Sequence, residues 1–479
     1  MRRTLKKAMS LVLTAALCVT AVIAGVFPAS AAAGYTAAEL AKSGKIKIQG
    51  RYALSGSDGS LLLENSASGI EFIADCSGDV SVTLKSTRMS YASGGAAKGG
   101  IYFTVLVDGV PQHFDERIPA DSSANNWTSN STNYPYVLTA KDEVKTFTLA
   151  EGLEPGEHRF EIYCQSQAKY GAYAVQSVTL DGEIKAAPAE NDLYIEFVGD
   201  SITAGHGNIA NGGTSDENTL YTDATRGWAY LTAKNLGADW SVIAQSGIAA
   251  TDGINWAKNP NASVKDWPSI GDVYPKLRFY SDQNTDYDFE RQPDVIVVGL
   301  GTNDVWLESD GAYKDYNIKE GFKDTLAMLR EYNPNAAIIW IYGMMTDGAN
   351  DRILAAVNEM GGKEAGLYTL RLPQNRSGGS GHPGLAVQET YAETVSGYIE
   401  SVLAGTSDKP ERPTGEIWDG TYAGSYAGGT GTADDPYLIA TAEQLARMIG
   451  YDVNTDYTSN TTNGSTNKYY KLTADIYLN

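Results

Sequence analysis

Five short apolar runs, each separated from the next by a segment with helix-like sequence, dominate residues 190–405. The runs are LYIEFV from Leu193, WSVIAQ from Trp240, DVIVVGL from Asp294, AAIIWIYG from Ala336 and LYTLRL from Leu367. Strands of a parallel sheet are buried on both faces, so they are apolar throughout, and their connections are long and usually helical. The pattern therefore predicts a three-layer α/β domain in which helices cover both faces of a parallel sheet.

The connecting segments contain four candidate helices, at residues 226–236, 318–332, 351–360 and 383–403. The last candidate places Pro383 in the first helical turn, where the missing N–H costs nothing.

The regions on either side of this domain have a different character. Residues 34–185 contain runs of period two, such as IYFTVLVDG from Ile101, separated by Asp-Gly and Pro-Gly turns. This pattern indicates antiparallel strands in a β-sandwich or jelly roll, with residues 186–190 as the exit linker. After a second linker at 406–415, residues 416–479 resemble the start of a β-rich repeat module, and we expect the native protein to continue past Asn479.

The first 33 residues have the composition of a bacterial secretory signal peptide. Arg2, Arg3, Lys6 and Lys7 precede a mostly apolar stretch over residues 11–26, which ends in small residues. The alternative, an N-terminal membrane anchor, is disfavoured because the apolar run is short for a span. We expect a secreted or cell-surface protein with no membrane span in the mature chain.

Charge and cysteine content exclude several kinds of ligand. A net charge of −21 disfavours nucleic acid as a partner, whereas 30 Tyr and 8 Trp offer flat surfaces for neutral sugar rings. Export would permit a disulfide between Cys76 and Cys164, but the spacing does not decide whether they pair. We find no metal-ligand spacing, P-loop or dinucleotide fingerprint, so we expect no essential metal or cofactor.

Polar residues follow four of the apolar runs. Ser201 follows the first run in Gly-Asp-Ser, Gly247 follows the second, Asn303 the third and His382 the fifth. Because ligands bind beyond the carboxyl ends of parallel strands, these residues should meet at one edge of the sheet. A serine nucleophile needs a base and donors for the oxyanion. We therefore predict Ser201 as nucleophile, His382 as base, and the N–H groups of Ser201 and Gly247 with the Asn303 amide as the oxyanion hole.

Each of these residues has a simpler alternative. Ser201 could cap a helix, and Asn303 could be an ordinary turn residue. His206 is the other histidine of this domain, but it lies only five residues past Ser201, and a base must approach from across the site. We therefore favour His382 as the base and place His206 at the pocket mouth. No Gly-x-Ser-x-Gly occurs, so the nucleophile elbow of α/β-hydrolases is absent.

Three aromatic residues are candidates for binding substrate. Trp306 follows the Asn303 loop and would be either a sugar platform or a partly buried packing residue. Tyr221 and Trp228 are weaker candidates of the same kind.

The polar blocks also carry a family resemblance. Gly199-Asp200-Ser201, Gly247, Gly301-Thr302-Asn303-Asp304 and His382-Pro383 resemble the four blocks of the SGNH (GDSL-type) hydrolases, over about residues 191–405. The resemblance implies a flavodoxin-like hydrolase domain in which Ser201, Gly247, Asn303 and His382 have the roles given above. A β-sandwich directly before such a domain in a secreted chain is similar to carbohydrate esterase family two, whose members deacetylate sugars.

One position departs from the superfamily pattern. Most members have Asp three residues before the histidine, whereas this chain has Gly379. The resemblance to family two implies a Ser-His dyad in which a backbone carbonyl orients the imidazole, and a glycine-rich loop can bring one close. Asp304 or a more remote acid stays open as an alternative partner of His382.

Taken together, these features predict a secreted carbohydrate esterase that removes O-acetyl groups from xylan or glucomannan. Its partner would be an acetylated polysaccharide or oligosaccharide, and the C-terminal module could contact glycan or the cell surface. A lipase or lysophospholipase on the same fold is one alternative. A catalytically inactive cell-surface adhesin that binds glycan is the other.

Overall fold

The computed structural model describes residues 33–89, 100–113, 134–210, 221–263, 265–280, 286–406, 423–448 and 468–473. The chain divides into two compact units, Met1–Leu403 and Ala404–Asn479. The predicted signal peptide lies outside the described residues except for Ala33, and the 406–415 linker except for Thr406. No helix within the described residues is long and apolar enough to cross a membrane.

The first unit begins with an antiparallel β region. Its strands are β1 (Ala33–Thr36), β2 (Lys47–Gln49), β3 (Tyr52–Leu54), β4 (Leu61–Leu63), β5 (Gly69–Met89), β6 (Ile101–Val107), β7 (Val110–Pro111), β8 (Val137–Leu138), β9 (Val144–Cys164) and β10 (Gly171–Ile184). The order β3-β4-β10-β5-β9-β6-β7 forms the main path, and the short helix α1 (Ala37–Lys42) follows β1. The predicted antiparallel strands are confirmed, and the finer jelly-roll assignment stays a prediction.

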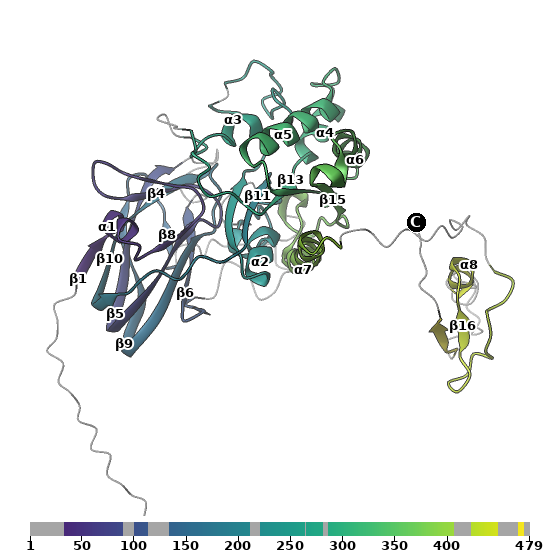
Figure 1. Ribbon diagram of the computed structural model, residues 1–479, viewed down its shortest axis with the longest axis horizontal. Coiled ribbons are helices and arrows are strands. Elements are labelled where there is room, and N and C mark those ends of the chain that lie inside the picture. Colours follow the sequence, from purple (N-terminus) through teal and green to yellow (C-terminus); the bar gives the residue numbers. More distant parts are fainter. Residues whose placement is uncertain are drawn as a thin grey trace, which may run out of the picture. The chain divides into compact units, whose positions relative to one another are not determined.

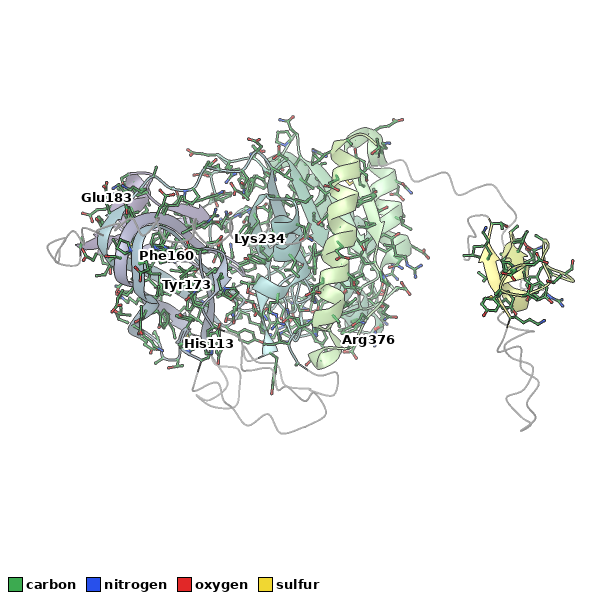
Figure 2. The ribbon with its side chains drawn as sticks, turned by 90° about the horizontal axis from the view of Figure 1, so that it is seen from below. His113, Phe160, Tyr173, Glu183, Lys234 and Arg376 are labelled. Carbon is green, nitrogen blue, oxygen red and sulfur yellow. The ribbon has the colours of Figure 1, made fainter. Side chains whose placement is uncertain are left out.

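Alternating side chains of these strands fill one apolar core. Phe72 and Phe160 face each other across β5 and β9, and their rings stack with centroids 4.8 Å apart. Figure 2 labels Phe160 and Tyr173, which belong to this core. Cys76 and Cys164 are buried in it as free thiols, so they are not paired in a disulfide. Burial raises the pKa of these thiols to about 11 and about 12, respectively.

The second part of the unit is built on a parallel sheet with the order β12-β11-β13-β14-β15. Its strands are β11 (Tyr194–Gly199), β12 (Asp239–Ala244), β13 (Val295–Gly299), β14 (Ala337–Tyr342) and β15 (Leu367–Arg371). Each strand coincides with one of the five apolar runs to within one residue at either end, so the predicted parallel sheet is confirmed.

Helices cover both faces of this sheet, with α2 and α7 on one face and α3 to α6 on the other (Figure 1). The helical segments are η3 (Ala224–Arg226), α2 (Trp228–Asn235), α3 (Ile270–Val273), α4 (Thr302–Ser309), α5 (Ile318–Tyr332), α6 (Asn350–Glu359), η4 (Gly362–Ala365), η5 (Gly379–Gly381) and α7 (Leu385–Leu403). Successive strand residues point to opposite faces: Phe197 joins the core under α2 and α7, and Val198 joins the core under α5 and α6.

The start of α7 differs from the prediction. The helix begins at Leu385, so Pro383 lies before it and not in its first turn. His382 is extended, as expected for a residue before proline, and the Pro383 carbonyl accepts the side-chain amide of Gln388 at 3.0 Å. The loop that carries His382 therefore continues through Pro383.

The β region packs on the β12 side of the parallel sheet through buried polar contacts. The N–H of Gly50 donates to the carbonyl of Trp240 at 3.1 Å, and Arg51 Nη2 lies 3.3 Å from Glu196 Oε2. Both side chains of this ion pair are at most 2% exposed, so removing one partner would leave a buried charge unpaired. Lys234 of α2, labelled in Figure 2, lies 3.5 Å from Glu161 of β9.

The second unit contains β16 (Tyr437–Ile439), α8 (Ala442–Arg447) and β17 (Tyr470–Leu472) among its described residues. β16 and β17 pair in parallel, and the ring of Tyr426 stacks on that of Tyr437 with centroids 4.5 Å apart. Assignment of this unit to a repeat module stays a prediction.

Candidate active site

Ser201 lies in a tight turn directly after β11. Gly199 ends the strand where a Cβ would come within 2.0 Å of Thr203 Oγ1, so only glycine fits. The Asp200 carboxylate accepts the N–H of Ile202 at 2.9 Å and holds the turn. Residues 201–209 form turns and no helix begins at Ser201, so its alternative interpretation as a helix cap is wrong.

A glycine-rich loop after β15 brings His382 to this serine. Nε2 of His382 lies 2.7 Å from Ser201 Oγ, and Nδ1 lies 3.1 Å from the carbonyl oxygen of Gly379. Because a carbonyl can only accept, it keeps the imidazole proton on Nδ1, so that Nε2 is unprotonated and can accept the serine proton. Gly379, which stands where most SGNH hydrolases have aspartate, thus places its backbone oxygen at Nδ1 of His382.

The glycine-rich loop is held by close backbone contact with the turn after Ser201. The Gly379 N–H donates to the Gly207 carbonyl at 2.8 Å, and the His382 N–H donates to the Gly379 carbonyl at 3.0 Å. Gly207 has a φ of +69°, and a Cβ there would lie 2.5 Å from the Gly379 oxygen. Glycine at position 207 is therefore required for the carbonyl to face His382.

Asp304 has a different role from the one left open for it above. Its carboxylate accepts the N–H groups of Ala250 and Thr251 at 3.1 and 2.8 Å, so it orders the loop after β12. Burial raises the pKa of both buried acids of the site, Asp304 and Asp200, and that of Asp200 reaches about 7.

The residues predicted for the oxyanion hole, Ser201, Gly247 and Asn303, line the same cleft. Gly247 follows β12 with a φ of +85°, and a Cβ there would lie 3.0 Å from the Trp256 ring. Asn303 lies in the first turn of α4, not in a turn outside it. Its Nδ2 donates to the Ile248 carbonyl at 2.8 Å, and its Oδ1 accepts from Trp256 Nε1 at 2.9 Å. Trp256 thereby fixes which end of the amide carries the donor.

A second imidazole lies next to the first. The ring of His206 is 2% exposed, and it packs edge-on against His382 with centroids 4.8 Å apart at 74°. Its Nδ1 lies 3.2 Å from Nε2 of Gln167, which comes from the loop between β9 and β10, and 3.5 Å from Thr222 Oγ1. Burial, with the nearby His382 and Lys169, holds the pKa of His206 well below its ordinary value.

These residues share one cleft of about 540 Å³. Its lining includes all the polar site residues predicted above, together with three tryptophans: Ser201, His206, Gly247, Asn303, His382, Trp256, Trp267 and Trp306. Trp256 and Trp267 are each 41% exposed at this surface. Among the described residues, no group of three His, Cys, Asp or Glu side chains is placed to hold a metal ion.

Two of the predicted substrate-binding aromatics lie elsewhere. Trp228 is fully buried and packs against Phe197 with centroids 5.5 Å apart, so its assignment to the cleft is wrong. Tyr221 is 7% exposed and is absent from the described lining, so that assignment is wrong as well. Trp306 lines the cleft and also packs on the cores, and Arg376, labelled in Figure 2, lies 5.7 Å from its ring.

Sequence reasoning missed two residues that shape the site. Trp256 orients Asn303, and Gln167 bridges the β region to His206 and to the Gly247 loop, whose Ser246 N–H it accepts at 2.7 Å. No local pattern marks either residue, because each acts through a partner that is distant in the sequence. The assembled geometry suits nucleophilic acyl transfer, since a hydroxyl, a base and the residues predicted as oxyanion donors line one cleft.

Comparison with known proteins supports this assignment. The model of the GDSL-like Lipase/Acylhydrolase family matches residues 197–370. The chain is 30% identical over 276 residues to the cellulase/esterase CelE of Acetivibrio thermocellus, an alignment that covers 54% of this chain and 32% of CelE. It is 26% identical over 298 residues to an acetylxylan esterase / glucomannan deacetylase of Cellvibrio japonicus, covering 52% and 78% of the two chains. The chain thus spans about a third of the length of CelE.

Solved structures share the fold. The acetyl xylan esterase Est2A of Butyrivibrio proteoclasticus superposes with a TM-score of 0.62 at 22% identity, covering 78% of this chain and 99% of that one. A family two carbohydrate esterase of Clostridium thermocellum in complex with cellohexaose superposes with a TM-score of 0.59 at 24% identity, covering 75% and 99%.

Proposed function

Because residues 197–370 form a GDSL-like lipase/acylhydrolase domain, we propose that this protein is a secreted esterase that removes O-acetyl groups from xylan or glucomannan through an acyl-enzyme on Ser201. The observation that carries the proposal is the contact of Ser201 Oγ with His382 Nε2 at 2.7 Å, with the Gly379 carbonyl at the other ring nitrogen. The deacetylase activities named for the relatives support the choice of substrate.

In the first step, Ser201 Oγ attacks the ester carbonyl carbon while its proton passes to His382 Nε2. The negative charge that develops on the carbonyl oxygen is stabilised by the N–H groups of Ser201 and Gly247 and the amide of Asn303. The Gly379 carbonyl accepts the Nδ1–H throughout and stabilises the imidazolium without an acid.

In the second step, His382 gives the proton to the departing sugar oxygen, and acetyl-Ser201 remains. Water then attacks the acetyl carbon as His382 Nε2 takes its proton. Collapse of this intermediate returns the proton to Ser201 Oγ and releases acetate. A Ser-His pair is sufficient for both steps, because Nε2 of His382 carries every proton that is transferred.

The residues that line the cleft favour a carbohydrate over a long acyl chain as the substrate. The exposed faces of Trp256 and Trp267 at its lining suit sugar rings. The charged residues of the lining, Arg88, Lys169, Lys265 and Asp266, are unsuited to an aliphatic tail.

Acetate release from acetylated xylan and acetylated glucomannan by the wild-type protein and Ser201→Ala tests the proposal. We expect release by the wild type and a loss of at least about a thousandfold in Ser201→Ala. Equal release by both proteins would refute the nucleophile. Faster hydrolysis of octanoyl than acetyl esters would favour a lipase, and glycan binding without turnover would favour an adhesin.

A further inference from the structure

Gln167 has a side-chain orientation that its surroundings determine. Its amide lies between the backbone N–H of Ser246, at 2.7 Å, and Nδ1 of His206, at 3.2 Å. A backbone N–H can only donate, so the amide oxygen must face Ser246 and the NH₂ group must face His206. Gln167 itself is fully buried, which leaves it no solvent to exchange these partners with.

The orientation of Gln167 determines the protonation of His206. Since the NH₂ group donates to Nδ1, that nitrogen must be unprotonated and the proton must lie on Nε2. A hydrogen on Nδ1 would meet the NH₂ group head-on, so the imidazolium is disfavoured as well. Burial and the neighbouring His382 and Lys169 act in the same direction.

The place of His206 connects this tautomer to the substrate. Its ring lines the cleft beside the base, with the two imidazole centroids 4.8 Å apart. The departing sugar oxygen must lie at His382 Nε2 to receive its proton. His206 lies beside that position, and none of the described residues bonds its Nε2.

We propose that Gln167 holds His206 as a neutral Nε2–H donor, and that this donor binds the sugar hydroxyl adjacent to the ester. The inference rests on the proposed function and deepens it: the enzyme selects acetyl groups that have a free neighbouring hydroxyl. A neutral donor suits this position, because a cation there would oppose the positive charge that His382 acquires during catalysis. Thus a residue of the β region sets the selectivity of a site on the parallel sheet.

The test compares two esters: a methyl xyloside monoacetate with a free hydroxyl next to the ester, and the same ester with that hydroxyl replaced by hydrogen. For the wild type we expect kcat/KM to favour the hydroxyl-bearing ester by roughly threefold to tenfold, as for one hydrogen bond. In His206→Phe, which keeps a ring without the donor, this ratio should fall to about one, and Gln167→Met should lower it part of the way.

His158→Phe is the matched control, because His158 lies on the β region and bonds to Asp108; its ratio should equal that of the wild type. A structural role of His206 would slow both esters equally and leave the ratio intact, which would overturn the inference. Equal hydrolysis of both esters by the wild type would overturn this inference but leave the proposed function standing. Hydrolysis of neither would refute the proposed function.

The protonation state has a test that requires no turnover. In ¹⁵N spectra of the histidine-labelled wild-type protein at pH 7, His206 should be the neutral Nε2–H tautomer. An Nδ1–H tautomer or an imidazolium would overturn the inference whatever the kinetics show.

Discussion

Replacing Gly207 by alanine should weaken His382 as a base, although His382 itself is unchanged. A Cβ at this position would lie 2.5 Å from the Gly379 oxygen, and contacts under 3.0 Å essentially never occur, so the carbonyl must move by about 0.5 Å or more. That carbonyl accepts the Nδ1–H of His382 at 3.1 Å. The movement removes the group that sets the tautomer and stabilises the imidazolium.

The size of the effect follows from that lost hydrogen bond. A hydrogen bond to a charged group contributes about 1.5–3 kcal/mol. Since about 1.36 kcal/mol corresponds to a factor of ten in rate, kcat should fall by about 10- to 150-fold. The positive φ of +69° should also cost about 1–2 kcal/mol of stability, because alanine disfavours the left-handed region.

Gly381→Ala separates the two effects. Gly381 lies in the same loop as Gly379 with a φ of +71°, but a Cβ there would meet nothing within 4 Å. This variant should therefore share the loss of stability while its kcat stays within about threefold of the wild type. The assay is the kcat for 4-nitrophenyl acetate, with unfolding by denaturant measured in parallel. Equal kcat values for folded Gly207→Ala and Gly381→Ala would refute the orienting role of the carbonyl.

Two further predictions concern Asn303 and Asp200. Trp256→Phe removes the donor to Asn303 Oδ1, so kcat for 4-nitrophenyl acetate should fall by roughly twofold to tenfold. Trp267→Phe, in the same cleft, is the control. Equal effects of the two substitutions on kcat would contradict this prediction. Burial raises the pKa of Asp200 from an ordinary 3.8 to about 7, so its ionisation costs the folded state stability as pH rises from about 4 to about 7. The free energy of unfolding of Asp200→Asn and of the wild type is measured with denaturant at pH 5 and at pH 8. The stability of the variant relative to the wild type should be greater at pH 8, and the whole titration can contribute at most about 4 kcal/mol. A difference between the two proteins that is independent of pH would contradict this.

The aromatic residues show where inference from sequence fails. Trp228 and Trp306 both lie on helices next to the predicted site, yet Trp228 is buried under α7 and Trp306 lines the cleft. Periodicity indicates that a helix has an apolar face, but which aromatic of a short helix reaches solvent depends on what packs above it. The prediction that Pro383 lies in the first turn of α7 was wrong for a related reason. The hydrogen bonds of the His382 loop extend through Pro383, so the helix starts only at Leu385.

The sequence by itself determined the parallel sheet, the bounds of α5 and the edge at which Ser201, Gly247, Asn303 and His382 meet. These features follow from local signals, because apolar runs specify buried strands and parallel strands must end at one edge.

Only the tertiary structure decided the contacts that make this edge a site. The Gly379 carbonyl faces His382 because Gly207 holds its loop, Trp256 orients an amide 47 residues away, and Gln167 reaches across 39 residues to His206. Such hydrogen bonds depend on ångström distances between segments that no sequence pattern brings together. The physical reason is that tertiary packing, and not local propensity, sets those distances: packing of the β region against the parallel sheet places Gln167, and packing of the loops at the sheet edge places the other two groups.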